Sequence, residues 1–399
     1  MGRRIWRQAR QHQRQCAGRT RQRPMSGALL PAAVAGRFFL PPGAVYLKSH
    51  SVGCQPRSAE ALLRDRMLTP WRETGEAWPH WLEAIDAWRA ALAELIGVEA
   101  RDLCPATNVS AALSRYLSAL GTATTRRTIL LAPSAFPTIG YVASGLAAAG
   151  WTTRYLPAAA DVRDPAQWAS ALDDDVALVV AMHVSSNSGA LTDTAAVAAA
   201  AHTAGARCIA DCAQSVGVVP VAPAAWGVDA VIGTSVKWLC GGPGAAWLWV
   251  APHDRTALDP MERGWWSHDN PFEMDIEIFR YAPDARRWWG GTPDVAPFIL
   301  STAGIEAIAA IGVERIRAHN RALQTILRAA LEPRTPQWRW PKGDIGGTLC
   351  IDTGTDQPRV AAALTANAIS ADFRGTTVRL SFHAYNGADD AEAAVRALV

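Results

Sequence analysis

The sequence predicts an α/β fold, with a mostly parallel sheet covered by helices on both faces and a smaller C-terminal α+β domain. The main observation is that short apolar runs rich in β-branched residues alternate with helical stretches between residues 129 and 250. Parallel strands are buried on both faces and are joined by helical crossovers, which gives this pattern. At 399 residues the chain can also bury a large core and form two domains.

Two helices are predicted ahead of the sheet. The apolar residues between Trp78 and Ile96 fall on one helical face, and Gly97 ends that pattern. A second helix is expected to begin after Thr107 and Asn108 and to run through residues 111–120, because either side chain can cap a helix.

Six strands are expected in the large domain. They cover residues 129–132, 152–156, 176–183, 207–211, 229–233 and 246–250, with helices at 139–149 and 193–204. Ligands of such sheets bind beyond the carboxyl ends of the strands. Polar residues follow three of the strands and are expected to meet there: His183, Ser185, Ser186, Asp211, Thr234 and Ser235.

The C-terminal part is predicted to begin with one long helix from residue 302 to about 330. The Pro- and Trp-rich stretch at 332–341 is interpreted as a surface connection. Strands at 347–351 and 378–382 then alternate with helices at 360–368 and 388–398. We therefore divide the chain into a basic, disordered extension and lead-in (1–44), a large domain (45–301) and a small domain (302–399).

Charge is distributed unevenly along the chain. Residues 1–24 contain eight arginines and no acid, although the formal net charge of the whole chain is only +3. The rest is therefore mildly acidic, which argues against a nucleic-acid partner. A transit peptide or a twin-arginine signal fits poorly, because no uninterrupted apolar segment follows. We interpret residues 1–24 as a disordered extension, with Met25 as an alternative start of translation.

The apolar stretches and the cysteines indicate whether the protein spans a membrane and in which kind of compartment it is found. No run of 18 consecutive apolar residues occurs, so no membrane span is expected. The seven cysteines are scattered without a Cys-x-x-Cys pair. This usage indicates neither a disulfide framework nor a zinc site, and it is typical of a reducing, cytoplasmic location.

Lys237 is the first candidate catalytic residue. Of the 39 basic residues only three are lysine, and Lys237 lies among the apolar residues Val236, Trp238 and Leu239. A lysine amine can lose its proton and attack a carbonyl carbon, whereas a guanidinium cannot. A lysine that extends to solvent from a strand end would give the same pattern, so composition alone does not separate the two.

Asp211 favours the catalytic interpretation. It closes the strand at 207–211, and a buried carboxylate there can keep a pyridine nitrogen protonated. The glycine-rich run at 241–244 allows close backbone approach and lacks the spacing of a dinucleotide fingerprint. The helix that opens at Thr107 and Asn108 can seat a phosphate on its amide groups.

These segments resemble a known family. Asp-Cys-Ala-Gln at 211–214 and Thr-Ser-Val-Lys-Trp-Leu-Cys-Gly-Gly-Pro-Gly at 234–244 resemble the fold-type I pyridoxal-5′-phosphate (PLP) enzymes of the class V aminotransferase family. Gly-Gly-Pro-Gly followed by Trp-Leu-Trp-Val at 247–250 is similar to its kynureninase branch. The resemblance begins near Tyr46. It implies a seven-stranded sheet, PLP as cofactor, and a homodimer whose active site is shared across the interface.

The resemblance also implies which residues hold the cofactor. Thr107 matches the phosphate-binding threonine, and Asn108 stands beside it. Phe136 matches the aromatic ring that stacks on the pyridine. Trp265 matches a tryptophan near the phosphate, and Thr292 matches a phosphate contact from the neighbouring subunit.

Catalytic and substrate-binding roles follow in the same way. Lys237 matches the lysine that forms a Schiff base with PLP, and Asp211 matches the partner of the pyridine nitrogen. Gln214 stands at a further cofactor-binding position. Arg379 matches the arginine that grips the α-carboxylate of an amino-acid substrate through a bidentate pair. An arginine inside an apolar strand needs a partner in any case.

The sequence departs from the family pattern at several positions. Val236 stands where a tyrosine usually precedes the lysine, and Gln214 replaces a histidine, as in cysteine desulfurases. Ile139 stands where an acid is expected, and Ser185 and Ser186 where Asn and Tyr are common. The cofactor anchors remain, so these changes bear on the reaction more than on PLP binding.

The expected function is therefore a PLP enzyme acting on a small amino acid. The first hypothesis is kynureninase-like hydrolysis of a Cβ–Cγ bond, which yields alanine and an aromatic acid. Alternatives are a Cβ–S or Cβ–N lyase, an aminotransferase, or a PLP-binding homologue without catalytic activity.

Overall fold

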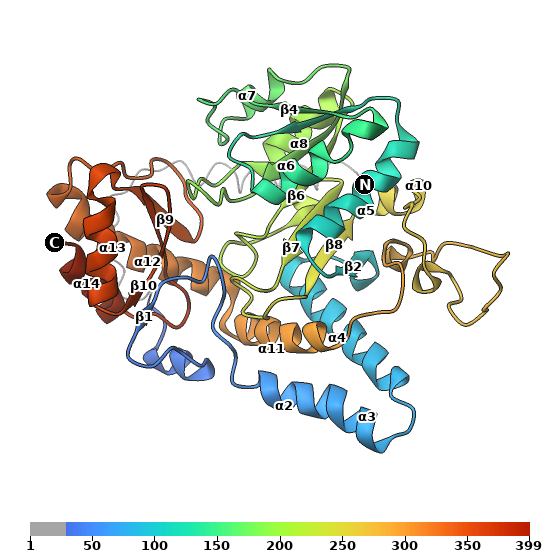
Figure 1. The fold of residues 1–399 in the computed structure, drawn as a ribbon, viewed down its shortest axis with the longest axis horizontal. Coiled ribbons are helices and arrows are strands. Elements are labelled where there is room, and N and C mark those ends of the chain that lie inside the picture. Colours follow the sequence, from blue (N-terminus) through green and yellow to red (C-terminus); the bar gives the residue numbers. More distant parts are fainter. Residues whose placement is uncertain (1–28) are drawn as a thin grey trace, which may run out of the picture.

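A computed structural model describes residues 29–399, in which a larger α/β body and a smaller C-terminal unit stand next to each other (Figure 1). The predicted disordered extension at residues 1–24 lies outside the described residues. So does the alternative start at Met25.

A seven-stranded sheet forms the centre of the larger body. Its order is β2 (Leu103–Ala106), β8 (Ala246–Val250), β7 (Ala230–Thr234), β6 (Arg207–Asp211), β5 (Val176–Met182), β3 (Thr128–Leu131) and β4 (Thr152–Tyr155). Only β8 runs in the opposite direction to the other six strands. The predicted, mostly parallel sheet is confirmed, and all seven residues of β5 are buried, as a central parallel strand requires.

Strand β2 is the one strand of this sheet that the sequence pattern did not indicate. It has only four residues, and one of them is Pro105. Proline cannot donate to a ladder and is confined largely to edge strands. Its place at the edge of the sheet, beside β8, accommodates that residue.

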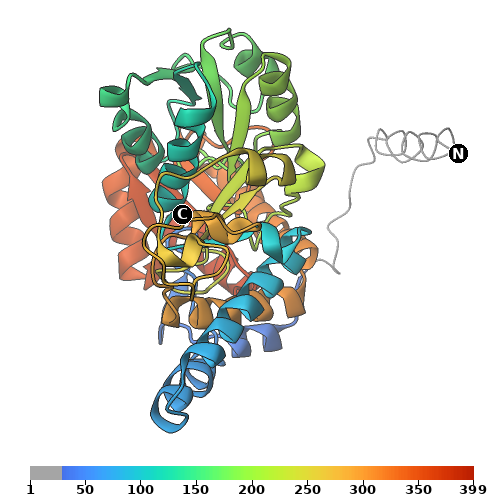
Figure 2. The same ribbon diagram turned by 90° about the vertical axis from the view of Figure 1, so that its right-hand side faces the viewer.

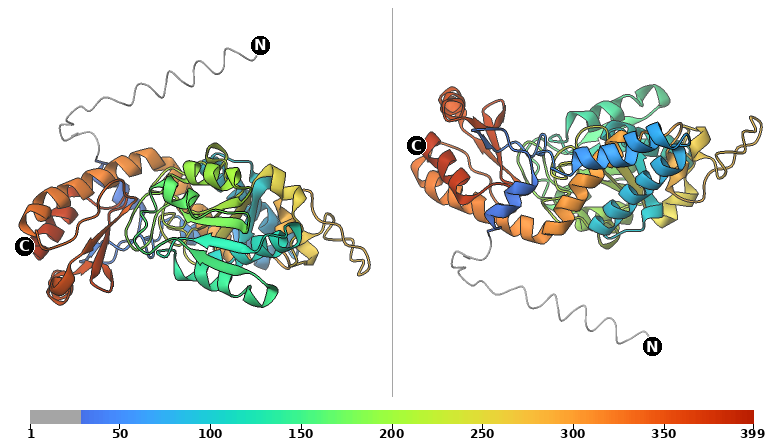
Figure 3. Two further views of the ribbon diagram at one scale, coloured as in Figure 1. Left: turned by 90° about the horizontal axis from the view of Figure 1, so that it is seen from above. Right: turned by 90° about the horizontal axis from the view of Figure 1, so that it is seen from below.

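Helices lie on both sides of the sheet when it is viewed from above (Figure 3). The helices between β2 and the end of the large-body sheet region are α5 (Val109–Ala123), α6 (Pro137–Ser144), α7 (Pro165–Ala169), α8 (Thr194–Thr203), α9 (Pro223–Trp226) and α10 (Pro252–Ala257), and α11 (Ala296–Ile311) follows them. Helix α5 packs against β2, β7 and β8, and α8 packs against β5 and β6. The predicted helix at 139–149 begins earlier, and a separate 3-10 turn covers Ala147–Ala149.

The helices before the sheet form an arm at its lower end (Figures 1 and 2). They are α2 (Ala59–Leu63), α3 (Thr69–Glu73) and α4 (Trp78–Ile96). The predicted helix at 78–96 is confirmed, and Gly97 ends it with a φ of +68°, which is the left-handed conformation that glycine adopts readily.

The prediction of one long helix at 302–330 is wrong. The structure has two helices, α11 (Ala296–Ile311) and α12 (Val313–Leu331), and a bend of 77° separates them. Gly312 joins them with a φ of +94°, which lies outside the helical region. Within residues 29–399 no single helix is long and apolar enough to cross a membrane, and only this bent pair has sufficient length and composition.

The smaller unit is built around an antiparallel sheet of β11 (Asp372–Arg374), β12 (Thr377–Ser381) and β9 (Thr348–Asp352). Helices α13 (Gln357–Ala366) and α14 (Ala388–Leu398) complete it together with α12. A separate two-stranded parallel sheet joins β1 (Val45–Tyr46) to β10 (Ile369–Ser370).

The packing of the smaller unit differs in detail from the predicted division of the chain into domains. Its apolar core contains Leu47 from the N-terminal segment, whereas the predicted boundary at 301/302 falls inside α11, which packs with the large body. Trp338 and Trp340 also belong to this core, so the stretch at 332–341 is more than a surface connection. Large indole rings supply the apolar volume that this short stretch buries.

Two glycines bring distant segments against the backbone around Lys237. A Cβ atom on Gly53 would lie 2.1 Å from the Lys237 carbonyl oxygen, and one on Gly304 of α11 would lie 2.0 Å from that of Leu239. No side chain fits at such distances. The N-terminal loop and α11 therefore hold this backbone from two sides.

Candidate active site

A cavity of about 220 Å³ lies beyond the carboxyl ends of β5, β6 and β7. Five of the predicted site residues line it: Asn108, Phe136, Asp211, Gln214 and Lys237. Ser186 and Thr234, which were expected to meet at this edge, line it as well. The structure thus gathers side chains from five separate segments of the chain around one space.

Lys237 faces this cavity and is partly exposed through it. Its Nζ atom lies 5.4 Å from the centre of the Phe136 ring. Burial lowers the pKa of Lys237, and the positive charges of Arg379 and Arg374 lower it further, while the negative charge of Asp211 opposes them. A lysine in such surroundings gives up its proton more readily than a lysine in water.

Asp211 is buried at the end of β6, with 2% of its surface exposed. Its Oδ1 atom accepts a hydrogen bond of 2.9 Å from the backbone N–H of Ala213. Burial raises the pKa of Asp211, and the Ala213 N–H and Lys237 act in the opposite direction. The carboxylate is therefore oriented by the backbone and still presents an oxygen toward a cation or a protonated nitrogen in the cavity.

The N-terminus of α5 supplies a seat for an anion. Asn108 caps this 15-residue helix by accepting a 2.9 Å hydrogen bond from the Ala111 N–H, and Val109 and Ser110 line the cavity. Amide groups in the first turn of a helix attract phosphate. Thr107 is exposed and does not line the cavity, and its Oγ1 atom accepts a 3.3 Å hydrogen bond from Asn108.

Two other predicted phosphate contacts lie elsewhere in the single chain. The indole N–H of Trp265 donates a 3.2 Å hydrogen bond to Thr292 Oγ1. Neither residue lines the cavity of Lys237. The structure brings these two residues to each other and does not bring them to the other predicted cofactor contacts.

Arg379 is buried on β12 and has the partner that its setting demands. Its Nε atom donates a 2.7 Å hydrogen bond to Asp372 Oδ1, and its Nη2 atom donates to the other oxygen of the same carboxylate. Its Nη1 atom donates a 3.1 Å hydrogen bond to the carbonyl of Ser186, a residue that lines the cavity. Arg379 therefore lies next to the cavity behind Ser186.

Three residues near Arg379 were missed by the sequence analysis. His50 contacts Asp372, and Arg374 lies on the same strand, β11, with its guanidinium carbon 5.5 Å from the centre of the Phe136 ring. Residues two apart on a strand share a face, so Asp372 and Arg374 point the same way. The sequence does contain a sign of this pair, because Asp372 and Arg374 are opposite charges two residues apart. It was missed because no strand was predicted at this short segment.

The departures from the family pattern have local explanations. Ile139 is fully buried and serves as apolar core. Gln214 donates a 3.0 Å hydrogen bond to the carbonyl of His50, so it joins the floor of the cavity to the N-terminal loop. The carbonyl of Val236 accepts a 2.8 Å hydrogen bond from the Gly53 N–H, which any residue at position 236 could do.

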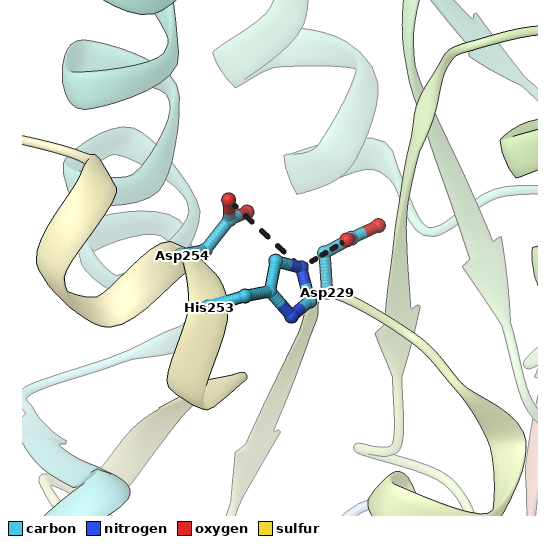
Figure 4. Close-up of side chains that lie close together, drawn as sticks. All are labelled: Asp229, His253 and Asp254. Carbon is cyan, nitrogen blue, oxygen red and sulfur yellow. Dashed lines mark hydrogen bonds and ion pairs between the residues drawn. The ribbon is translucent and has the colours of Figure 1, made fainter.

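A second group of ionisable side chains, Asp229, His253 and Asp254, lies beside the start of β7, at the other end of that strand from the Lys237 cavity (Figure 4). Asp229, just before β7, is 2.9 Å from His253 Nε2 and accepts a 2.7 Å hydrogen bond from the Cys208 N–H. Asp254 accepts a bidentate pair from Arg207 and lies 4.0 Å from the same histidine nitrogen. Protein donors already occupy these carboxylates, so we assign the group a structural role that joins α10 to the sheet.

The residues around the Lys237 cavity fit PLP in chemical kind. An amine, a buried carboxylate, an aromatic ring and a helix N-terminus match the aldehyde, the pyridine nitrogen, the ring face and the phosphate of that cofactor. Together with the seven-stranded sheet and the C-terminal unit, this site defines a PLP-dependent enzyme of fold type I.

Comparison with known proteins specifies the family. The chain matches the aminotransferase class-V family over residues 60–393. It is 31% identical to the kynureninase of Burkholderia pseudomallei strain K96243 over 312 residues, which is 76% of this chain and 74% of the relative. It is 31% identical to the Deinococcus radiodurans kynureninase over 310 residues, with 75% and 74% covered. The chain belongs to the class V aminotransferase family, and within it to a kynureninase-like branch.

Solved structures agree on the fold. The apo cysteine desulfurase of Thermococcus onnurineus NA1 superposes with a TM-score of 0.80 at 19% identity, over 93% of this chain and 98% of that one. The cystine C–S lyase C-DES gives 0.80 at 19%, over 90% and 97%. Identities this low establish a shared architecture and carry no information on the substrate.

The setting of Lys237 predicts how the apo-protein captures PLP. We expect the capture rate to rise with pH through a midpoint below 10.5, the ordinary pKa of lysine, because burial favours the neutral amine. Asp211→Asn should move the midpoint lower still, since it removes the negative charge that stabilises the ammonium ion. Stopped-flow absorbance measures both, with the exposed Asp174→Asn as control. A midpoint at or above 10.5 would contradict this account.

Proposed function

We propose that this protein is a PLP-dependent hydrolase of the kynureninase type, which cleaves an aryl-keto amino acid into alanine and an aromatic acid. The net reaction adds water across the Cβ–Cγ bond: hydroxyl goes to the carbonyl carbon, and hydrogen goes to Cβ. The supporting observation is the cavity that joins Lys237, Asp211 and Phe136 in a chain 31% identical to kynureninases.

Each residue has a defined task in this proposal. PLP, when bound, withdraws electrons from the substrate's Cα atom. The Lys237 amine takes the proton from that carbon and returns one to the product, and its lowered pKa suits both roles. Asp211 holds a proton on the pyridine nitrogen, while Phe136 confines the ring from one face. Arg379 binds the α-carboxylate of the substrate.

A second candidate is a Cβ–S or Cβ–N lyase, or an aminotransferase, on the same scaffold. The absence of the usual tyrosine at Val236 and of a histidine at Gln214 favours it. A desulfurase that uses a mobile thiol is less well supported. The six cysteines of the described residues are all buried. Burial raises the pKa of Cys350, which pairs with Arg379 across β9 and β12, to about 12.

The test is turnover of L-kynurenine and 3-hydroxykynurenine by the PLP-loaded protein. We expect alanine and the matching anthranilate in equal amounts. Lys237→Ala should lower kcat by at least about 10³-fold, because the group that moves the proton is lost. Replacing the distant Lys342 with Ala, a matched lysine on a surface loop, should leave the rate unchanged.

The outcome that contradicts the proposal is equally clear. A protein that binds PLP with its usual visible absorbance but releases no anthranilate would favour the second candidate. A screen for pyruvate, sulfide and keto-acid products would then identify the reaction.

We also propose that a second copy of the chain completes the cofactor site. Trp265 and Thr292 match phosphate contacts but lie away from the single-chain cavity. The segment that contains Trp265 exposes large apolar side chains, which are typical of an interface: Met261, Phe272, Met274, Ile276 and Ile278. Such a surface fits an isologous dimer.

Mixing two weak PLP binders tests this arrangement. Lys237→Ala and Thr292→Ala chains, co-refolded, should recover tight PLP binding at about a quarter of all sites if Thr292 acts across the interface, because half the dimers form as hybrids and each hybrid rebuilds one of its two sites. No recovery would place Thr292 in its own subunit's site or outside any site.

A further inference from the structure

We propose that Asp372 is a positioning residue that fixes the orientation of Arg379 for the α-carboxylate of the substrate. This inference rests on the role given to Arg379 in the proposed function. It assigns a task to a residue that contacts neither cofactor nor substrate in that proposal. The geometry around the carboxylate carries it.

The Asp372 carboxylate accepts hydrogen bonds from one side of the Arg379 guanidinium, where Nε and Nη2 lie. The Nε atom donates to one carboxylate oxygen at 2.7 Å and the Nη2 atom donates to the other, which is the planar, bidentate geometry that an arginine and a carboxylate share. The Ser186 carbonyl accepts from Nη1 at 3.1 Å. Three fixed contacts therefore hold a flexible side chain in one plane.

Arg379 is only 4% exposed, and these contacts leave two of its terminal N–H groups without a partner among the described residues. Each terminal nitrogen carries two hydrogens, and one on each is used by Asp372 or Ser186. One N–H on Nη1 and one on Nη2 remain. A second carboxylate can accept both of them, so binding of Asp372 and binding of a substrate carboxylate are compatible.

Asp372 also joins Arg379 to the N-terminal loop through His50. The His50 Nε2 atom lies 2.9 Å from Asp372 Oδ1, and its Nδ1 atom lies 2.9 Å from Ser381 Oγ on β12. His50 is 1% exposed, and its backbone carbonyl accepts from Gln214 on the cavity wall. The Asp372 carboxylate on β11 thus contacts both Arg379 on β12 and His50 in the N-terminal loop. The same loop is joined to the cavity through the hydrogen bond from Gln214 to the His50 carbonyl.

The charges of this cluster suit one carboxylate. Burial is the main cause that lowers the pKa of His50. Burial acts to raise the pKa of Asp372, but the hydrogen bonds with His50 and Arg379 outweigh it and hold that pKa below its usual range. Asp372 therefore cancels one of the two positive charges of Arg379 and Arg374. The remaining positive charge matches a single α-carboxylate.

The experiment compares two probes of the PLP-loaded protein, L-alanine and L-alaninamide, which lacks the carboxylate. Their dissociation constants are read from the change in visible absorbance, so no turnover is needed. The wild type should prefer L-alanine. In Asp372→Asn this preference should fall by about tenfold or more, the size typical of losing a partner that orients a binding group.

Two further variants make the result specific. Arg379→Lys should lose the same preference, and the double variant should lose little more, because both changes remove one function. Asp372→Glu keeps the charge but moves the carboxylate, so it should also weaken discrimination, which covers the case in which Asp372→Asn does not fold. Asp352→Asn on β9, which breaks an ion pair with Arg339, should behave as wild type.

The contrary results are distinct. An unchanged preference in Asp372→Asn and Asp372→Glu, or additive losses in the double variant, would overturn the inference. Tighter L-alanine binding in Asp372→Asn would show that Asp372 competes with the substrate. A protein that discriminates the probes as described but leaves kynurenine intact would retain this inference and disprove the proposed function.

Discussion

The mutual charge effect of Lys237, three residues after β7, and Asp211, at the end of the neighbouring strand β6, is the constraint on which the rest of the site depends. Both groups are largely removed from bulk water, and an ionisable group in that setting requires a compensating charge or a change of protonation. Their spatial proximity comes from the parallel order of β5, β6 and β7, which places three strand ends at one edge. Gly53 and Gly304 then fix the Lys237 backbone by contacts that exclude any side chain. The fold therefore maintains a reactive amine that an isolated segment could not.

The second charged layer of the site lies in the smaller unit. Asp372 and Arg379 belong to β11 and β12, and Ser186 from the large body accepts a hydrogen bond from Arg379. The Arg379 contact therefore joins the smaller unit to a residue of the cavity wall. The positive charges of Arg379 and Arg374 lower the pKa of Lys237, whereas the negative charge of Asp211 raises it. A substrate carboxylate that neutralises these cations would raise the pKa of the amine. In the proposed function, substrate binding at Arg379 would therefore be coupled through charge to proton transfer by Lys237.

The regular parts of this architecture could be predicted from sequence. Continuous apolar runs identified β5 and β6, a one-sided apolar pattern identified α4, and the capping residues Thr107 and Asn108 identified the start of α5, because burial and capping are local in sequence. The break at Gly312 was missed, since a glycine in an apolar helical pattern gives no direct sign of its φ angle. His50 and Asp372 were missed for a different reason. Their significance arises only from contacts 322 residues apart in the chain, which no periodicity encodes.

The position of the covalent bond to the cofactor is the most direct test of this account. The chain has only three lysines, Lys48, Lys237 and Lys342, so the assignment is unambiguous. The PLP-loaded protein is reduced with borohydride, digested, and analysed by mass spectrometry for the phosphopyridoxyl modification. We predict a single modified peptide that contains Lys237, at close to one cofactor per chain. Modification of Lys48 or Lys342 instead, or absence of any adduct in a protein that retains PLP, would contradict the central claim.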